Sequence, residues 1–231
     1  MRFGDLSGQV SGSGPLLVLL HGNGEDHHLF DPIVPLLAPT HRVVALDSRA
    51  HGASPPGDGP LTIERMAEDL AGVLDALGAG EADLVGFSDG GNIALTFALS
   101  HPERVRSALV YGANLAPGGL RLLTRCQLVV ALWALRVASL FHRRARARAQ
   151  TWALMTVQPR IDPAGLAAVT APVLVMAGQR DLVKDSHTRQ IAAALPNGQL
   201  RIVPGAGHFL PVKDPARFAG FINDFLASQA I

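Results

Sequence analysis

The residues with the clearest capacity for chemistry form the run Gly86-Phe87-Ser88-Asp89-Gly90. An apolar run precedes it and a helical pattern follows, so the serine is expected on a sharp turn between a strand and a helix. Such a turn lifts the hydroxyl clear of the sheet and directs the positive end of the helix at it. Glycines two residues away on either side allow the backbone to approach where a Cβ would clash. The pattern predicts that Ser88 is a nucleophile.

A serine hydroxyl needs a base within hydrogen-bond reach, and the base needs a carboxylate to orient it. We expect His208 to be the base, because it follows the last predicted strand at the carboxyl edge of the sheet, where catalytic groups gather. Asp181 follows the preceding strand and is the expected carboxylate. Asp185 is its rival, and Asp162 is less favoured because it belongs to an insertion.

Acyl transfer also needs backbone N–H groups that point at the oxyanion. We expect one from Asp89, which follows the nucleophile, and one from the loop His21-Gly22-Asn23-Gly24. Asn23 is the favoured donor in that loop, with Gly24 as the alternative. The competing interpretation of the loop is an ordinary glycine turn.

To lie close together, these residues need a fold that brings the ends of several strands to one edge. Short apolar runs, bounded by Gly, Pro or Asp, predict strands over residues 16–20, 43–46, 84–87, 108–111, 173–176 and 200–203. Apolar residues at helical spacing predict helices over residues 63–77, 92–99, 186–195 and 215–226. Thr62 and Gly78 are the expected N-cap and C′ residues of the first helix. Strand–helix alternation predicts an α/β fold, a mostly parallel twisted sheet with helices on both faces.

One segment, residues 114–165, breaks the alternation and is expected to form a mostly helical insertion. It holds eight arginines and one acid, Asp162, which gives seven net positive charges. Its apolar run over 128–141 is shorter than the roughly 20 residues that span a bilayer. The apolar side chains are expected to line a cavity or to pack the insertion onto the core: Leu128, Val129, Leu132, Trp133, Val137, Leu140 and Phe141. Among them, Trp133 is a candidate for substrate contact.

The arginines over residues 143–148 have two interpretations. The simpler is that Arg143, Arg144, Arg146 and Arg148 form a solvated face. The alternative is contact with an anionic substrate or a lipid surface, since a basic amphipathic helix can lie on a membrane.

The composition narrows the classes of function. The chain has 231 residues, 48 % of them apolar, and a net charge of +1, so no global field attracts nucleic acid. One cysteine, Cys126, allows neither an internal disulfide nor a thiolate metal cluster, which favours a reducing, cytoplasmic compartment. Residues 1–13 lack the apolar stretch of a signal peptide. We expect a small-molecule substrate, no cofactor, no metal and no integral membrane segment; the oligomeric state stays open.

Five motifs, in order along the chain, resemble the α/β-hydrolase superfamily. They are His21–Gly24, similar to the HGxG oxyanion loop; 47–54, similar to DxRGHGxS; the Gly86–Gly90 elbow; and the acid- and histidine-bearing segments 172–181 and 205–208. The resemblance covers nearly the whole chain outside the insertion. It implies a hydrolase core over 1–113 and 166–231, a helical cap over 114–165, and a triad of Ser88, Asp181 and His208.

The departures from the family pattern refine this expectation. Only residues 6–10 have room to form a strand before residue 16, so the family's first strand is expected to be missing. Ala50 stands in place of a usual glycine, and we interpret it and Asp47 as structural. Asn114 stands where some relatives carry the acid, which favours Asp181. A serine at 88 argues against dehalogenases and epoxide hydrolases, whose nucleophile is aspartate.

The leading hypothesis is therefore a serine hydrolase that cleaves carboxylic esters through an acyl-enzyme. A carbon–carbon bond hydrolase with the same triad is an alternative, although Phe87 and Asn92 stand where such relatives often carry Asn and a polar anchor. A ligand-binding protein without catalysis is a third. Asp89 is expected either to be paired locally or to receive a cationic group of the substrate, as in the amino-ester hydrolases that share Ser-Asp-Gly-Gly.

Overall fold

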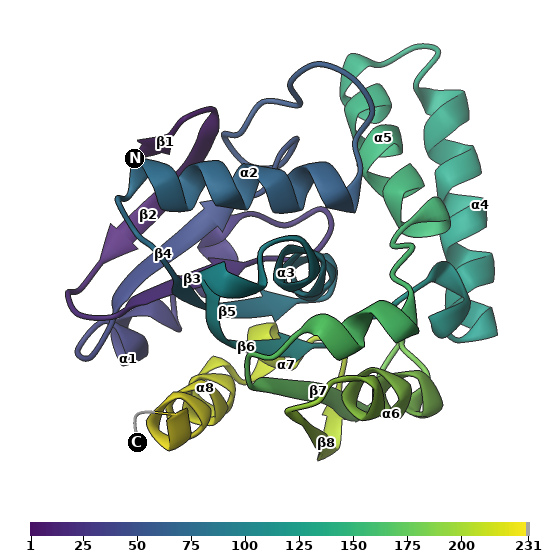
Figure 1. Cartoon of the computed structure of the whole chain (residues 1–231). Coiled ribbons are helices and arrows are strands. Elements are labelled where there is room, and N and C mark those ends of the chain that lie inside the picture. The colour runs from purple at the N-terminus through teal and green to yellow at the C-terminus, as the bar shows by residue number, and fades with distance from the viewer. Residues whose placement is uncertain (230–231) are drawn as a thin grey trace.

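The computed structural model describes residues 1–229, with the side chains of residues 143, 144 and 147 outside that description. Eight strands form one sheet in the order β1-β2-β4-β3-β5-β6-β7-β8 (Figure 1). The first two strands are antiparallel to their neighbours and the other six run parallel. Their bounds are β1 Arg2–Phe3, β2 Leu6–Ser11, β3 Leu16–Leu20, β4 Arg42–Asp47, β5 Ala82–Phe87, β6 Val105–Tyr111, β7 Val173–Arg180 and β8 Gly198–Gly207. The predicted α/β fold with a mostly parallel sheet is confirmed.

The central strands are apolar throughout because both faces of the sheet are covered. Every residue of β3 and β5 is buried. Leu17 and Leu19 belong to one core cluster while Val18 and Leu20 belong to the other, as strand alternation requires. The helices that cover the sheet are α1 Val34–Leu37, α2 Ile63–Ala76, α3 Asp89–Ser100, α6 Asp185–Ala194, α7 Leu210–Lys213 and α8 Pro215–Gln229.

Helix α2 shows how local sequence sets these boundaries. The Thr62 side chain accepts a hydrogen bond from the Arg65 N–H, and Gly78 takes a positive φ of 65° just beyond the helix. The predicted cap residues are thus confirmed. Helix α3 begins at Asp89, three residues before the predicted start, because the chain turns from β5 into the helix at Ser88 alone.

The expectation that the family's first strand is missing is wrong. Gly4, with φ 60°, reverses the chain so that Arg2 and Phe3 pair antiparallel with β2 as the two-residue strand β1. Phe3 joins the core from this strand. Two residues are too few to produce an alternating pattern, so this strand could not be predicted from periodicity.

The segment between β6 and β7 consists mainly of two helices, α4 (Leu122–Ala138) and α5 (Arg143–Val157). Figure 1 shows α5 beside the core and α4 on its outer side. Short 3₁₀ turns η1 to η4 complete the chain at His27–Phe30, Pro102–Arg104, Pro117–Gly119 and Pro163–Ala168. Among residues 1–229, no helix is both long enough and apolar enough to cross a membrane.

The expected packing of the apolar side chains of residues 128–141 is correct for Leu132, which is buried. It is wrong for five others, which point to solvent instead of a cavity or the core: Val129, Trp133, Val137, Leu140 and Phe141. Arg146 and Arg148 are exposed, while the predicted solvated face at Arg143 and Arg144 lies outside the described side chains.

Candidate active site

Ser88 sits on a strained turn between β5 and α3. Its φ of 53° and ψ of −118° lie in a region that side chains other than glycine rarely adopt. A Cβ on Gly86 would collide with the Gly90 backbone, and one on Gly90 would collide with the Leu20 carbonyl. The two glycines of the predicted elbow are therefore needed for the turn that exposes the Ser88 hydroxyl.

The structure brings the predicted nucleophile, base and acid into one hydrogen-bonded chain. The His208 Nε2 lies 3.1 Å from the Ser88 Oγ, and the His208 Nδ1 lies 2.7 Å from an Asp181 oxygen. Because a carboxylate can only accept, Nδ1–H donates to Asp181 and leaves Nε2 to accept the serine proton. Each of the three residues directly follows the last residue of a strand, β5, β7 or β8.

Asp181 is fixed from both sides. Its two oxygens accept hydrogen bonds from the Gly178 and Val183 N–H groups, each at 3.1 Å. Burial raises the pKa of this carboxyl, but the hydrogen bond and charge of His208 and the two N–H donors outweigh burial, so the pKa is lowered. The two other candidate acids have structural partners. Asp185 forms an exposed ion pair with Arg189 on α6, and Asp162 caps η4 by accepting from the Ala164 N–H.

Of the two predicted oxyanion donors, Asn23 lies on the loop after β3 and Asp89 is the first residue of α3. Neither the Asn23 N–H nor the Asp89 N–H has a hydrogen-bond acceptor among the described residues. His21 holds the Asn23 loop in place, because its Nε2 accepts from the Ser48 N–H at 3.0 Å and its Nδ1 donates to the Gly22 carbonyl at 2.7 Å. Burial lowers the pKa of His21 to about 4, so the ring stays neutral.

Asp89 lies in a network of side-chain amides rather than at an open surface. One of its oxygens accepts from the Asn23 amide and the other from the Asn92 amide, both at 3.0 Å. Asn92 continues the network to Asn114, whose backbone N–H donates to it at 2.8 Å. Burial raises the pKa of Asp89, opposed by these amides. The local pairing expected for Asp89 is present, since each carboxylate oxygen accepts from one of these amides.

Asn23 also ties this network to the inserted helices. Its side-chain amide donates to the Thr151 carbonyl of α5 at 2.7 Å, as well as to Asp89. A single side chain therefore links the oxyanion loop, the start of α3 and α5. Only the backbone of Asn23 was predicted to matter, since its side-chain partner at 151 lies 128 residues away.

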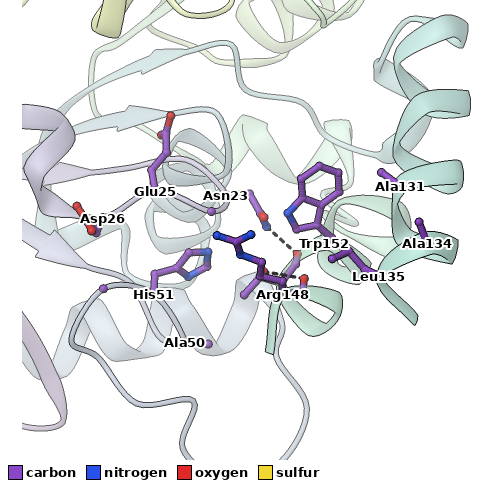
Figure 2. A pocket seen from close by; sticks show the side chains of 13 residues that line it. Asn23, Glu25, Asp26, Ala50, His51, Ala131, Ala134, Leu135, Arg148 and Trp152 are labelled. Carbon is purple, nitrogen blue, oxygen red and sulfur yellow. Dashed lines mark hydrogen bonds between the residues drawn. The ribbon is translucent and has the colours of Figure 1, made fainter. Parts of the chain in front are cut away.

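A cavity of about 650 Å³ opens beside the oxyanion loop, between that loop and helices α4 and α5 (Figure 2). It is lined by Asn23, Gly24, Glu25, Asp26, Ala50, His51, Gly52, Ala131, Ala134, Leu135, Arg148, Thr151 and Trp152. Figure 2 shows the Arg148 guanidinium pointing into the cavity from α5. Trp133, the predicted substrate contact, is absent from this lining and is 69 % exposed, while Trp152 stands in the cavity wall.

Two buried acceptors at this wall have no partner among the described residues, the Asn23 Oδ1 and the His51 Nε2. His51 donates through Nδ1 to the Arg49 carbonyl, so Nε2 carries a lone pair. Sequence reasoning missed His51, Arg148 and Trp152 as cavity residues. The motif at residues 47–54 indicated that His51 lies on a loop, but it did not indicate which way the imidazole ring points.

Glu25 lies on the same loop as Asn23, close to Ser88. Its carboxylate accepts from the Gly22 N–H at 3.1 Å, and a Cβ on Gly22 would lie 3.0 Å from that carboxylate and 3.1 Å from the Ser88 Cβ. Burial raises the pKa of Glu25 to about 7, against the lowering effect of the Gly22 N–H and of His208. The charge of this side chain therefore changes near neutral pH within the site.

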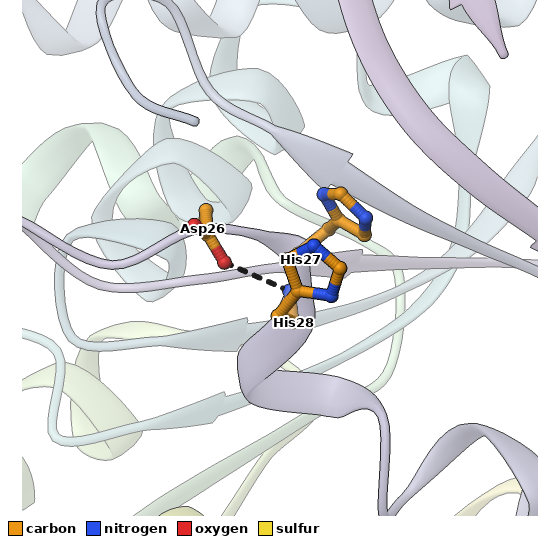
Figure 3. Close-up of side chains that lie close together, drawn as sticks. All are labelled: Asp26, His27 and His28. Atoms are coloured by element: carbon orange, nitrogen blue, oxygen red, sulfur yellow. Dashed lines mark hydrogen bonds between the residues drawn. The ribbon is translucent and has the colours of Figure 1, made fainter. Parts of the chain in front are cut away.

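Asp26, His27 and His28 form a group whose potential ligand atoms lie within 4.8 Å of one another (Figure 3). Each is engaged in the turn η1: Asp26 caps it by accepting from the His28 N–H, and His27 Nδ1 lies 2.7 Å from Asp47. Asp47 also accepts from the N–H groups of His27 and Ala53. These hydrogen bonds give the cluster a structural role, which is the role expected for Asp47.

The fold, the strained serine and the hydrogen-bonded chain behind it define a hydrolase of the α/β class, and comparison with known proteins agrees. The chain belongs to the alpha/beta hydrolase fold family, whose model matches residues 15–127. It is 30 % identical to 2-hydroxymuconate semialdehyde hydrolase of Pseudomonas sp. strain CF600, over 94 % of this chain and 88 % of that protein.

Two further proteins that resemble the chain are named for other activities. The chain is 33 % identical to a proposed carbamate hydrolase, RutD, of Variovorax paradoxus, over 93 % of this chain and 92 % of that protein. The structure of the esterase RhEst1 from Rhodococcus sp. ECU1013 matches with a TM-score of 0.79 at 25 % identity, over 97 % of this chain and 95 % of the other. The protein is thus a hydrolase of this family.

Proposed function

We propose that the protein is a serine hydrolase that cleaves carboxylic esters of small molecules through an acyl-enzyme intermediate. The observation that carries the proposal is the unbroken chain of hydrogen bonds from Ser88 through His208 to Asp181. The likeness to RhEst1 supports ester chemistry, since that structure is named an esterase.

In the first half of the reaction, the His208 Nε2 removes the proton from Ser88 while Oγ attacks the ester carbonyl. The backbone N–H groups of Asn23 and Asp89 donate to the oxyanion that forms. Protonated His208 then gives its proton to the leaving alcohol, and the acyl group stays on Ser88. Asp181 holds the imidazole in the required tautomer throughout.

In the second half, His208 removes a proton from water, which attacks the acyl-enzyme carbonyl. The same two N–H groups stabilise the second oxyanion, and Oγ leaves with the proton held by His208. Every group that moves a proton in this scheme belongs to the chain.

The substrate is expected to be small and partly polar. The cavity combines the apolar surfaces of Trp152 and Leu135 with the polar side chains of Arg148, Asn23 and His51. In this proposal residues 1–113 and 166–231 form the catalytic core and 114–165 the cap over its cavity. We also propose a cytoplasmic location, which the single free and exposed cysteine, Cys126, supports.

A second candidate is hydrolysis of a carbon–carbon bond by the same three side chains. The relative named 2-hydroxymuconate semialdehyde hydrolase favours it. A chromogenic ester series of increasing acyl length, assayed beside a vinylogous diketone with a scissile carbon–carbon bond, separates the two. Higher kcat/KM on the esters supports the proposal, and preference for the diketone overturns it in favour of the second candidate.

Ser88→Ala tests the catalytic role itself, and Ser186→Ala on exposed α6 is the matched control. Loss of the nucleophile should reduce kcat by roughly 10⁴-fold or more while unfolding by urea stays close to that of the parent protein. An organophosphonate should label the parent protein and the control but not Ser88→Ala. A parent protein that resists labelling and cleaves none of these substrates would instead be a binding protein on this fold.

A further inference from the structure

The outer face of α4 carries a stripe of large apolar side chains that the fold leaves in solvent. We call this the α4 stripe; its members are 43 % to 78 % exposed and comprise Leu122, Leu123, Val129, Val130, Trp133 and Val137 of α4, with Leu140 and Phe141 in the turn directly after it. Figure 1 shows α4 on the outside of α5, with no other element beyond it. Patches of this kind on a folded protein mark a surface that meets a partner.

The spacing of these residues shows that the stripe is continuous. At 3.6 residues per turn, Val130 and Val137 lie two turns apart on one line, and Val129 and Trp133 lie beside them. Leu132, which lies nearly opposite Val130 around the helix, packs inward. Helix α4 is thus apolar on two sides, one used by the fold and one not.

Arginines accompany the stripe along its length. Arg125 lies four residues from Val129, and Arg136 lies three residues from Trp133, so both flank the stripe along one edge, with Arg121 at its beginning. All three are exposed. The only acid of residues 114–165, Asp162, lies in the separate turn η4.

We propose that the α4 stripe docks on the surface of an anionic phospholipid bilayer. Apolar side chains that enter the boundary between headgroups and acyl chains, with arginines beside them at the phosphates, form the pattern of an interfacial helix. A second copy of the chain fits less well, because pairing two α4 stripes would bring Arg121, Arg125 and Arg136 of each copy toward the same cluster in the other.

Docking through α4 has a consequence for the cavity. Ala131, Ala134 and Leu135 of this helix line the cavity, so its wall on this side belongs to the helix that would lie on the lipid. The proposal does not depend on the bond that the enzyme cleaves, because it rests only on the outer face of α4.

Binding to vesicles tests the proposal directly. Full-length protein is sedimented with sucrose-loaded vesicles of phosphatidylcholine, with or without 30–40 % phosphatidylglycerol. We expect binding to the anionic vesicles at least tenfold tighter than to the neutral ones, and weaker binding as salt is raised. Equal binding to both vesicles, or binding to neither, overturns the proposal; a concentration-dependent dimer in light scattering would then assign the stripe to a second copy.

Variants separate the apolar and charged parts. Leu123→Asn with Val130→Asn removes apolar contact, and Arg125→Gln with Arg136→Gln removes two charges. Each pair should weaken binding to anionic vesicles about tenfold or more, while hydrolysis of a soluble ester stays at the parent rate. Arg2→Gln with Arg217→Gln is the control, since it removes the same charge from the exposed side far from α4 and should bind like the parent. A control pair that weakens binding as much as the α4 pairs overturns the assignment to α4.

Trp133 provides a second readout that does not use activity. The only other tryptophan is Trp152, so Trp152→Phe leaves Trp133 as the single indole. Anionic vesicles should shift its emission to the blue, and brominated lipids should quench it. Emission that stays unchanged while the protein sediments with the vesicles would show that another surface binds and would overturn the proposal.

Discussion

The elbow around Ser88 and the outer face of α4 are built in opposite ways. At the elbow the polar side chains of Asp89, Asn92 and Asp181 have partners inside the fold, and glycines allow backbones into contact. On α4, by contrast, large apolar side chains such as Trp133 and Val130 are mostly exposed. The elbow is thus held by contacts within the chain, whereas the α4 stripe is the surface that we propose docks on lipid.

The strongest test of the elbow is Asp181→Asn. The amide keeps the size of the carboxylate but its NH₂ group competes with the His208 Nδ1–H, so the ring loses the tautomer that leaves Nε2 free. We expect kcat to fall about 10⁴-fold while KM changes little. Steady-state kinetics on a soluble ester measure both.

Asp185→Asn is the control for this substitution, since Asp185 pairs only with Arg189 at the surface. It should retain activity within about twofold, because an exposed ion pair contributes little. If Asp185→Asn lost as much activity as Asp181→Asn, the acid of the site would be misassigned.

The two sides of α4 should respond very differently to truncation. Leu132→Ala removes a buried side chain and should lower the free energy of unfolding by about 2–5 kcal/mol. Val130→Ala, on the exposed side, should change it by about 0.5 kcal/mol or less. Urea titrations of both variants measure the difference, and similar losses from both would contradict the orientation of the helix.

That Ser88, Asp181 and His208 lie together could be predicted from the sequence, because each one directly follows a strand. Ser88, Asp181 and His208 follow β5, β7 and β8, and parallel strands bring those ends together at one edge whatever the sequence between them. The direction of the α4 stripe could not be predicted in the same way. Helical periodicity identifies an apolar side but not whether that side meets the core, which depends on how α5 packs.

The contacts that the sequence did not predict join residues that are distant in the chain. The Asn23 side chain meets Asp89 and the Thr151 carbonyl, and no spacing within a motif encodes such contacts. Arg148 and Trp152 reach the cavity only because α5 lies against the oxyanion loop. Strand β1 was not predicted because two residues are too few to show an alternating pattern.

Asp89→Asn tests whether the elbow network positions the oxyanion donors. An asparagine offers one acceptor where Asn23 and Asn92 each donate to a carboxylate oxygen, so one amide loses its partner. We expect about 1–3 kcal/mol of lost stability and a fall in kcat of the order of tenfold, since the backbone N–H of residue 89 remains.

The same variant decides between the two roles considered for Asp89. If its carboxylate only positions the loops, the ratio of rates on an α-amino ester and its des-amino analogue will match that of the parent. A ratio that falls in Asp89→Asn would show that the carboxylate receives the cationic group, contrary to its pairing with two amides. Activity equal to the parent on both substrates would contradict the positioning role.

The smallest effect we expect comes from Glu25→Gln, and it should depend on pH. Because the folded pKa is raised to about 7 from 4.5, the folded protein holds more protons than the unfolded chain between these values. The stabilising effect of protonated Glu25 is complete below pH 4.5 and is lost as the pH rises through 7. The variant should therefore gain stability over the parent above pH 7.

The same ionisation places a negative charge beside the developing oxyanion. Above pH 7 this charge should oppose the reaction by about 1 kcal/mol, so Glu25→Gln should exceed the parent in kcat/KM about fivefold at pH 8.5 and match it at pH 5.5. Asp26→Asn neutralises another acid of the same cavity wall and keeps the cap of η1, so its ratio to the parent should stay constant over this range. A Glu25→Gln ratio that is also constant would mean that the carboxylate acts only through its bond to the Gly22 N–H. The Glu25 carboxylate would then be held by its hydrogen bond in the same way as the polar side chains at the elbow.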